Sequence, residues 1–193
     1  MFKYKVINNY FDEKDLIELT LIVNDPNNSQ GLTDDGKVHI QLEKNFKDYL
    51  IKKYQNRWIK NLNELNPLKS KLFEYADMQV TLTGKNCVYP IHNDQIEKLL
   101  SGVVYLSPEK NLGTFIYDNK KNNKKEIEWE INKAFIFSRK DKDTWHSYMS
   151  DGLSIRCTVN FNLYTTNGNK VVIIDRGLIY FCLKKIRDFI FKN

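Results

Sequence analysis

The chain has 193 residues, of which 41% are hydrophobic and 13% aromatic, enough for one substantial core. It has no apolar run near the roughly 20 residues that span a bilayer and no secretory signal pattern at its start. Three widely spaced cysteines argue against a disulfide framework and a zinc cluster. We therefore expect a cytoplasmic protein with a single domain over residues 1–193.

The net charge is +6, from 30 basic and 24 acidic residues. Nucleic-acid binding is nevertheless disfavoured, because arginine, the side chain suited to bidentate phosphate and base contacts, supplies only five of the basic residues. The lysines are scattered, which indicates a solvated surface.

The first part of the chain begins with a predicted strand at residues 4–10. A helix follows to about residue 24, with Asp12 as its N-cap and Asp15 in its first turn. Residues 25–36 are rich in turn formers, so they form either a lid over a site or a mobile surface loop.

Residues 37–42 alternate as a strand does, and residues 43–75 carry an apolar stripe at helical spacing. We expect that stripe to pack on a sheet, which makes residues 1–75 a mainly helical support region. His39 has no acidic or imidazole neighbour two residues away, so we expect it to have a structural role or none.

From residue 77 the period of the hydrophobic pattern changes to two. The predicted strands are 78–83, 87–94, 100–106, 112–117, 126–130, 133–139, 144–149 and 153–164. Short strands at this spacing indicate an all-β sandwich or barrel.

The last of these strands is apolar on one side and polar on the other, and the polar side carries Arg156. We expect the polar side to line an interior cleft, with Arg156 buried beside an anionic partner. An exposed and mobile Arg156 would instead indicate an ordinary strand facing solvent.

The tail, residues 166–193, combines a possible strand at 171–174 with a predicted helix at 178–191. The helix is broadly apolar, with Lys184, Lys185, Arg187 and Lys192 on its remaining side. Peripheral membrane contact through 178–192, docking on the barrel and a dimer contact all remain open.

A candidate metal site lies in the middle of the chain. His92 and Asp94 are two residues apart, so on a strand both point to the same side. With His146 they form two imidazoles and one carboxylate, a ligand set suited to Fe(II), although Zn(II) remains possible. Three ligands on one face of the metal leave room for a bidentate 2-oxo acid and for O2. The far carboxylate of the 2-oxo acid would pair with Arg156.

These residues give the stretch from Met78 to Tyr164 a resemblance to the 2-oxoglutarate/Fe(II)-dependent dioxygenase superfamily, specifically its prolyl-4-hydroxylase-like branch. The resemblance implies a mainly β (α+β) fold. Its core, residues 76–165, would be a double-stranded β-helix of the jelly-roll or cupin-like kind, with N-terminal helices packed on one sheet. It also implies Fe(II), 2-oxoglutarate and O2 as cofactors, with ascorbate as a supporting reductant.

The resemblance assigns further residues. Gly84 and Tyr89 match a turn and a tyrosine before the first histidine, and Tyr105 matches a tyrosine that contacts the co-substrate. Thr83 stands where the branch commonly has another co-substrate tyrosine. Because Asp94 is retained, a halogenase is disfavoured.

The expected function is hydroxylation of a C–H bond, in a protein side chain or a small molecule, with succinate and CO2 as co-products. Substrate contacts are predicted for Asn86, Tyr89, Trp145 and Asn160. The alternatives are a non-catalytic, metal-binding cupin-like module and a membrane-attached accessory protein.

Overall fold

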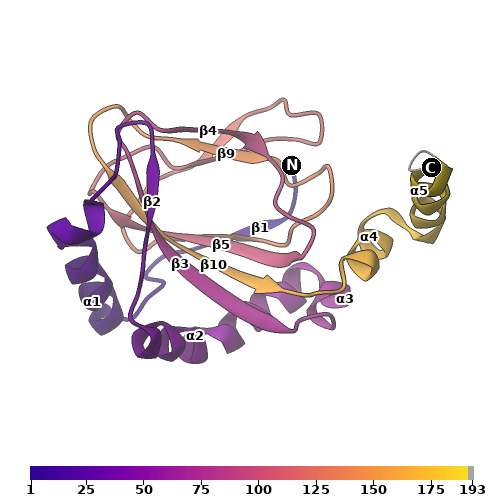
Figure 1. The fold of residues 1–193 in the computed structure, drawn as a ribbon, viewed down its shortest axis with the longest axis horizontal. Coiled ribbons are helices and arrows are strands. Elements are labelled where there is room, and N and C mark those ends of the chain that lie inside the picture. Colours follow the sequence, from indigo (N-terminus) through magenta and orange to yellow (C-terminus); the bar gives the residue numbers. More distant parts are fainter. Residues whose placement is uncertain (191–193) are drawn as a thin grey trace.

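The computed structural model describes residues 1–190 and contains two antiparallel sheets that face each other, with helices outside one of them (Figure 1). The larger sheet has the order β1-β8-β5-β10-β3-β2. Its strands are β1 (Tyr4–Ile7), β2 (Lys37–Ile40), β3 (Tyr75–Thr83), β5 (Lys98–Ser107), β8 (Ala134–Phe137) and β10 (Arg156–Tyr164). The smaller sheet has the order β4-β9-β6-β7, with β4 (Val88–His92), β6 (Thr114–Ile116), β7 (Lys125–Ile127) and β9 (His146–Met149). The predicted double-stranded β-helix with helices packed on one sheet is confirmed.

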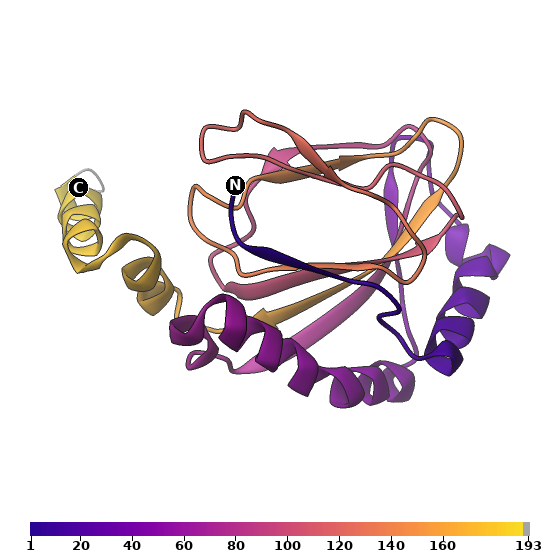
Figure 2. The same ribbon diagram turned by 180° about the vertical axis from the view of Figure 1, so that it is seen from behind.

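The N-terminal helices cover the outer face of the larger sheet (Figure 2). They are α1 (Glu13–Asn24), the 3-10 helix η1 (Pro26–Ser29), α2 (Lys44–Leu65) and α3 (Pro67–Ser70). In α2 the predicted apolar stripe is buried at steps of four residues, through Leu50, Tyr54, Trp58 and Leu62. The indole of Trp58 stacks on Phe161 of β10, with 4.7 Å between ring centroids, so the stripe holds the helix against the sheet.

Strand β10 separates the core from the interior of the barrel. Alternate side chains, Cys157, Val159, Phe161 and Leu163, are buried in the core between sheet and helices. Gly102 of β5 lies across from Phe161, and a Cβ at that position would collide with the phenyl ring. The side chains between them point the other way, into the space between the sheets.

The end of segment 25–36 is held to the barrel by backbone hydrogen bonds. The backbone N–H of Gly84 donates to the carbonyl of Gly36 (2.9 Å), and that of Asn86 donates to the carbonyl of Asp34 (2.8 Å). These bonds fix the end of the segment beside the turn that precedes β4, and they place β2 at the edge of the larger sheet.

Two local predictions are corrected. The strand predicted at 153–164 begins only at Arg156, because the Asp151 carboxylate accepts the backbone N–H groups of Leu153 and Ser154 and turns the chain. Asp12 stands at the N-cap position of α1 without a side-chain capping bond, and its carboxylate pairs with Lys53 instead (2.8 Å).

The tail differs from its prediction. The strand proposed for 171–174 is wrong, since these residues belong to α4 (Gly168–Arg176), where Asn167 accepts the Lys170 N–H as an N-cap. After Gly177 comes α5 (Leu178–Ile190), and the two helices form an arm that extends away from the sheets (Figures 1 and 2). The predicted helix end at Phe191 and the predicted basic residue Lys192 lie outside the described residues. Within residues 1–190, no helix has the length and apolar character needed to cross a bilayer.

Candidate metal centre and its cavity

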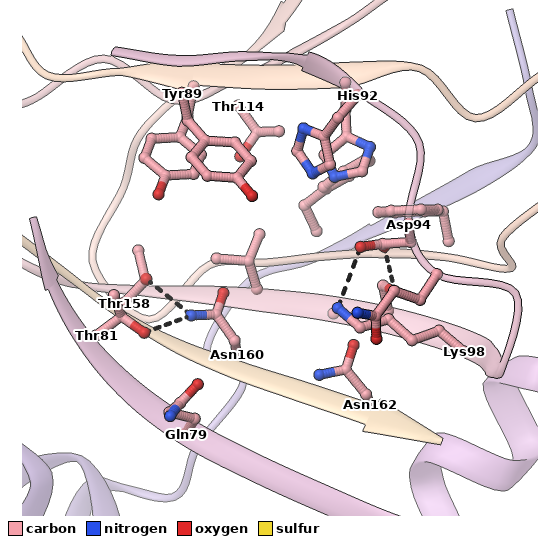
Figure 3. Close-up of a pocket in the computed structure, with 18 of the residues that line it drawn as sticks. Gln79, Thr81, Tyr89, His92, Asp94, Lys98, Thr114, Thr158, Asn160 and Asn162 are labelled. Carbon is pink, nitrogen blue, oxygen red and sulfur yellow. Dashed lines mark hydrogen bonds and ion pairs between the residues drawn. The ribbon is translucent and has the colours of Figure 1, made fainter. Parts of the chain in front are cut away.

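A cavity of about 550 Å³ lies between the two sheets (Figure 3). Its walls come from β3, β5 and β10 on one side and from β4 and β9 on the other. The polar side chains of β10, from Arg156 to Asn162, line this cavity. The polar face of the strand therefore borders an interior cleft, as the alternation predicts.

The three predicted metal ligands meet at one point of the cavity. His92 ends β4, His146 begins β9, and the two residues are paired in register, with ring centroids 4.2 Å apart. Asp94 lies just beyond the end of β4. One ligand atom from each residue lies within 4.8 Å of the others. The geometry thus brings two imidazoles and a carboxylate within reach of a single ion.

Both imidazoles are oriented by backbone carbonyls. Nδ1 of His92 lies 3.0 Å from the carbonyl of Pro90, and Nδ1 of His146 lies 3.0 Å from that of Thr144. A neutral ring that donates from Nδ1 keeps the lone pair of Nε2 free for a metal. Burial lowers the pKa of His146 and outweighs the opposing charge of Asp94, which favours that neutral form.

The carboxylate of Asp94 is almost buried and is held from two directions (Figure 3). Ser101 donates to one oxygen (2.6 Å) and the Lys98 ammonium to the other (3.1 Å). Burial alone would raise the pKa of Asp94, but the charge of Lys98 and the hydrogen bonds from Ser101 and Lys98 hold it below its ordinary value. The group is therefore an ionised and fixed potential ligand.

Arg156 is buried, with only 2% of its surface exposed. Its guanidinium carbon lies 5.1 Å from the ring centroid of Trp129 and 4.7 Å from that of Tyr148. One of its nitrogens donates weakly to the carbonyl of Met149 (3.4 Å), and Nε has no hydrogen-bond partner. Within residues 1–190, no carboxylate forms an ion pair with it. The expected burial is observed, but the expected anion is not supplied by these residues.

A buried cation with an unpaired N–H is costly unless something satisfies it. The aromatic faces of Trp129 and Tyr148 offset part of that cost, and the indole of Trp129 is itself fixed by a bond to the Pro108 carbonyl (2.8 Å). A carboxylate that enters the cavity would supply the missing acceptor. The arrangement around Arg156 therefore fits the anionic co-substrate that the sequence implies.

The two other predicted co-substrate residues lie differently. Thr83 lines the cavity and pairs with Arg156 in the register of β3 and β10. Tyr105 is buried behind the wall, where its hydroxyl accepts the backbone N–H of Thr114 (3.0 Å) and is within bonding distance of the Ile127 carbonyl (3.3 Å). Its ring stacks on Trp129 at 4.5 Å and so supports the aromatic enclosure of Arg156.

Of the predicted substrate contacts, Tyr89 and Asn160 line the cavity, whereas Asn86 and Trp145 do not. Asn86 belongs to the turn bound to Asp34. Trp145 directly precedes His146, which points inward, so its own side chain takes the opposite direction and is covered by Lys121 (4.1 Å).

Some residues that line or adjoin the cavity were not predicted from the sequence. Tyr148 stands two residues after His146 on β9, so the period of two of a strand could have found it. Trp129 carries no local signal, because only the fold brings it to Arg156. His39 also lines the cavity, with Nδ1 3.1 Å from the Thr81 hydroxyl.

Comparison with known proteins supports the fold. No family model matches the chain, and no curated protein matches it. A prolyl-4-hydroxylase from Pseudomonas putida is 11% identical over 86% of this chain and 94% of that chain, with a TM-score of 0.66. A prolyl hydroxylase from Trichoplax adhaerens, in complex with a hypoxia inducible factor oxygen degradation domain peptide fragment, is 13% identical over 86% and 84%, with a TM-score of 0.64. A viral collagen prolyl hydroxylase from Paramecium Bursaria Chlorella virus-1, in a 2OG complex, is 14% identical over 84% and 96%, with a TM-score of 0.58. At such low identity the likeness establishes the fold.

Proposed function

We propose that the protein is an Fe(II)- and 2-oxoglutarate-dependent oxygenase that hydroxylates a C–H bond and releases succinate and CO2. The observation that carries this proposal is the pairing of two features in one cavity. His92, Asp94 and His146 form a possible metal site, and Arg156 is a buried cation without an anion. An iron enzyme that uses a dicarboxylic co-substrate requires both features.

The metal would be held by Nε2 of His92 and His146 and by an oxygen of Asp94. Ferrous iron bound there would supply the chemistry that couples the oxidative decarboxylation of 2-oxoglutarate by O2 to the hydroxylation of a substrate. The protein's own part is positioning. The carbonyls of Pro90 and Thr144 fix the two imidazoles, and Ser101 keeps the carboxylate in place.

The far carboxylate of the co-substrate would pair with Arg156, with the Thr83 hydroxyl beside it. The rings of Trp129 and Tyr148 lie beside the guanidinium, and such an apolar surrounding strengthens a charge-assisted bond. The viral collagen prolyl hydroxylase of this fold was solved in a 2OG complex, which supports the same co-substrate here.

The substrate would occupy the part of the cavity away from Arg156. Figure 3 shows amide side chains there, from Gln79, Asn160 and Asn162, pointing into the cavity from the larger sheet. Amides offer both donors and acceptors, so this wall suits a polar substrate. A protein side chain such as proline and a polar small molecule both remain candidates. The peptide bound to the Trichoplax adhaerens protein supports the former.

The test is succinate release from 2-oxoglutarate with Fe(II), O2 and ascorbate, screened against peptide and metabolite libraries. We expect turnover by the native protein and none by Asp94→Ala or His146→Ala. His39→Ala is the matched control, because it removes a cavity imidazole outside the metal set and should retain turnover. Absence of succinate from the native protein across both libraries, together with no stabilisation by 2-oxoglutarate, would refute the proposal.

A non-catalytic metal-binding module is the second candidate. The ion pair between Lys98 and Asp94 favours only its metal-free form, because the ammonium competes with any divalent ion for that carboxylate. This candidate predicts tight Zn(II) binding, or no metal at all, and no effect of 2-oxoglutarate on thermal stability.

A further inference from the structure

Helix α5 presents its apolar side to solvent. Leu178, Ile179, Leu183, Ile186 and Phe189 are each between 58% and 79% exposed. At about 100° per residue these side chains fall within an arc of about 140° on the helix. One broad apolar face is therefore uncovered in the described chain.

The opposite side of α5 is the one that is partly covered. Tyr180, Phe181, Lys184 and Asp188 are half-buried, and the guanidinium carbon of Arg176 in α4 lies 5.0 Å from the Tyr180 ring centroid. A helix that packs on its own protein turns its apolar face inward and its charges outward. Helix α5 instead covers only the side with Tyr180 and Phe181 and leaves its wider apolar face in solvent, which indicates that this face serves a partner outside this chain.

The charges around that face identify the partner. Helix α5 has three basic residues and one acidic residue, a net charge of +2. Lys185 and Arg187 are exposed and lie at the two edges of the apolar arc. From these positions their long side chains can reach outward to anionic headgroups while their stems lie along the apolar surface.

The shape of the arm agrees with a flat partner. In both ribbon views α5 lies at the outer end of α4, away from the sheets, so an extended surface can reach α5 without meeting the barrel (Figures 1 and 2). An arc of about 140° is also wider than the narrow seam of a two-stranded coiled coil. This width favours a lipid surface over a second copy of the helix.

We propose that α5 binds an anionic membrane surface, lying in the plane of the interface with its apolar face at the acyl boundary. Lys185 and Arg187 contact the headgroups from either side. The inference is independent of the proposed oxygenase activity, because no residue of α5 lines the cavity.

The test is co-sedimentation of the full chain with vesicles of phosphatidylcholine, with or without phosphatidylserine, at low and high salt. We expect binding to the phosphatidylserine vesicles, and at least a tenfold loss on omitting phosphatidylserine or raising the salt. Lys185→Ala with Arg187→Ala should weaken binding roughly 25-fold, from about fivefold for each basic residue near the surface. Ile179→Asp with Leu183→Asp should abolish it.

Matched controls lie on α1 and α2. Leu21→Asp removes another exposed apolar residue, and Lys14→Ala with Lys52→Ala removes two exposed basic residues; neither change should alter vesicle binding. All these positions are exposed, so the variants should keep the native circular dichroism and melting temperature. Two results would overturn the proposal. One is equal sedimentation of native protein and α5 variants. The other is that the native protein does not bind vesicles but forms a concentration-dependent dimer, and that Ile179→Asp with Leu183→Asp abolishes this dimer.

Discussion

Two regions of this protein each contain a buried arginine, and the positive charge of that arginine is compensated differently in each. Arg139, beside the start of the C-terminal arm, is 5% exposed and donates to Asp175 (2.8 Å) and Asp141 (3.3 Å). The fully buried Lys69 also pairs with Asp175, at 2.7 Å. Two cations thus share one carboxylate of the chain itself, that of Asp175, and the cluster attaches α4 to the barrel.

Arg156, in the cavity, is at least as deeply buried but has aromatic rings where Arg139 has carboxylates. Its Nε has no partner among the described residues. The comparison teaches that burial alone does not distinguish structure from function. A buried cation with its own carboxylate holds the fold together, whereas one without a carboxylate is available to a ligand.

The largest effect is expected from removal of the shared carboxylate. Asp175→Ala leaves Lys69 and Arg139 buried without their common partner, which should lower the free energy of unfolding by about 3–5 kcal/mol. Urea denaturation monitored by circular dichroism measures this loss. Glu130→Ala is the control, because that carboxylate is exposed and its loss should change stability by no more than about 0.5 kcal/mol. A similar small change for Asp175→Ala would refute the structural role of the cluster.

The next effect concerns the other arginine. Arg156→Met should leave the melting temperature unchanged or raise it, because it replaces an unpaired buried charge with an apolar chain of similar length. Stabilisation by 2-oxoglutarate, measured anaerobically by thermal shift with Fe(II), should need about 100-fold more ligand. Arg57→Met is the matched control, because Arg57 donates to the Tyr10 carbonyl (2.7 Å) and does not line the cavity; it should do the opposite, with lower stability and unchanged ligand affinity. Equal protection of the native protein and Arg156→Met would remove Arg156 from the co-substrate site.

A buried carboxylate extends the comparison to negative charge. Burial alone would raise the pKa of Asp15, but hydrogen bonds from Lys53 and Tyr54 outweigh it and hold the pKa below its ordinary value. Because the folded pKa is depressed, this stabilisation is fully present above the unfolded pKa and is lost as the pH falls through the folded pKa. Asp15→Asn should therefore cost about 2 kcal/mol at neutral pH and less in acid. Urea denaturation at both pH values measures the difference, and a cost independent of pH would contradict it.

The smallest effect tests Tyr105, which lies behind Arg156. Tyr105→Phe should lower stability by about 1 kcal/mol, because the Thr114 N–H loses its acceptor. Since that hydroxyl is already engaged by Thr114 and Ile127, we expect the affinity for 2-oxoglutarate to change by less than about threefold. A tenfold loss would instead place the hydroxyl on the ligand, as the family resemblance implies.

The sequence by itself determined what depends on local periodicity. The spacing of His92 and Asp94 predicted that their side chains converge, and the alternation around Arg156 predicted a polar face toward the barrel interior. The helical stripe from Leu50 to Leu62 predicted a helix on a sheet. In the last two cases the side of an element that a residue occupies follows from the repeat of its own backbone; Asp94 lies beyond the end of β4, so the irregular segment after His92 places its carboxylate.

Only the tertiary structure decided what lies opposite those faces. The β-branched run at 171–174 suits a strand or a helix, and the Asn167 cap and the Asp175 cluster made it helical. The aromatic enclosure of Arg156 joins Trp129 and Tyr148, which no spacing in the sequence connects. The outward direction of the apolar face of α5 likewise depends on which surface the arm leaves free. These three features depend on contacts between segments that are distant in the sequence, and local sequence patterns do not encode such contacts.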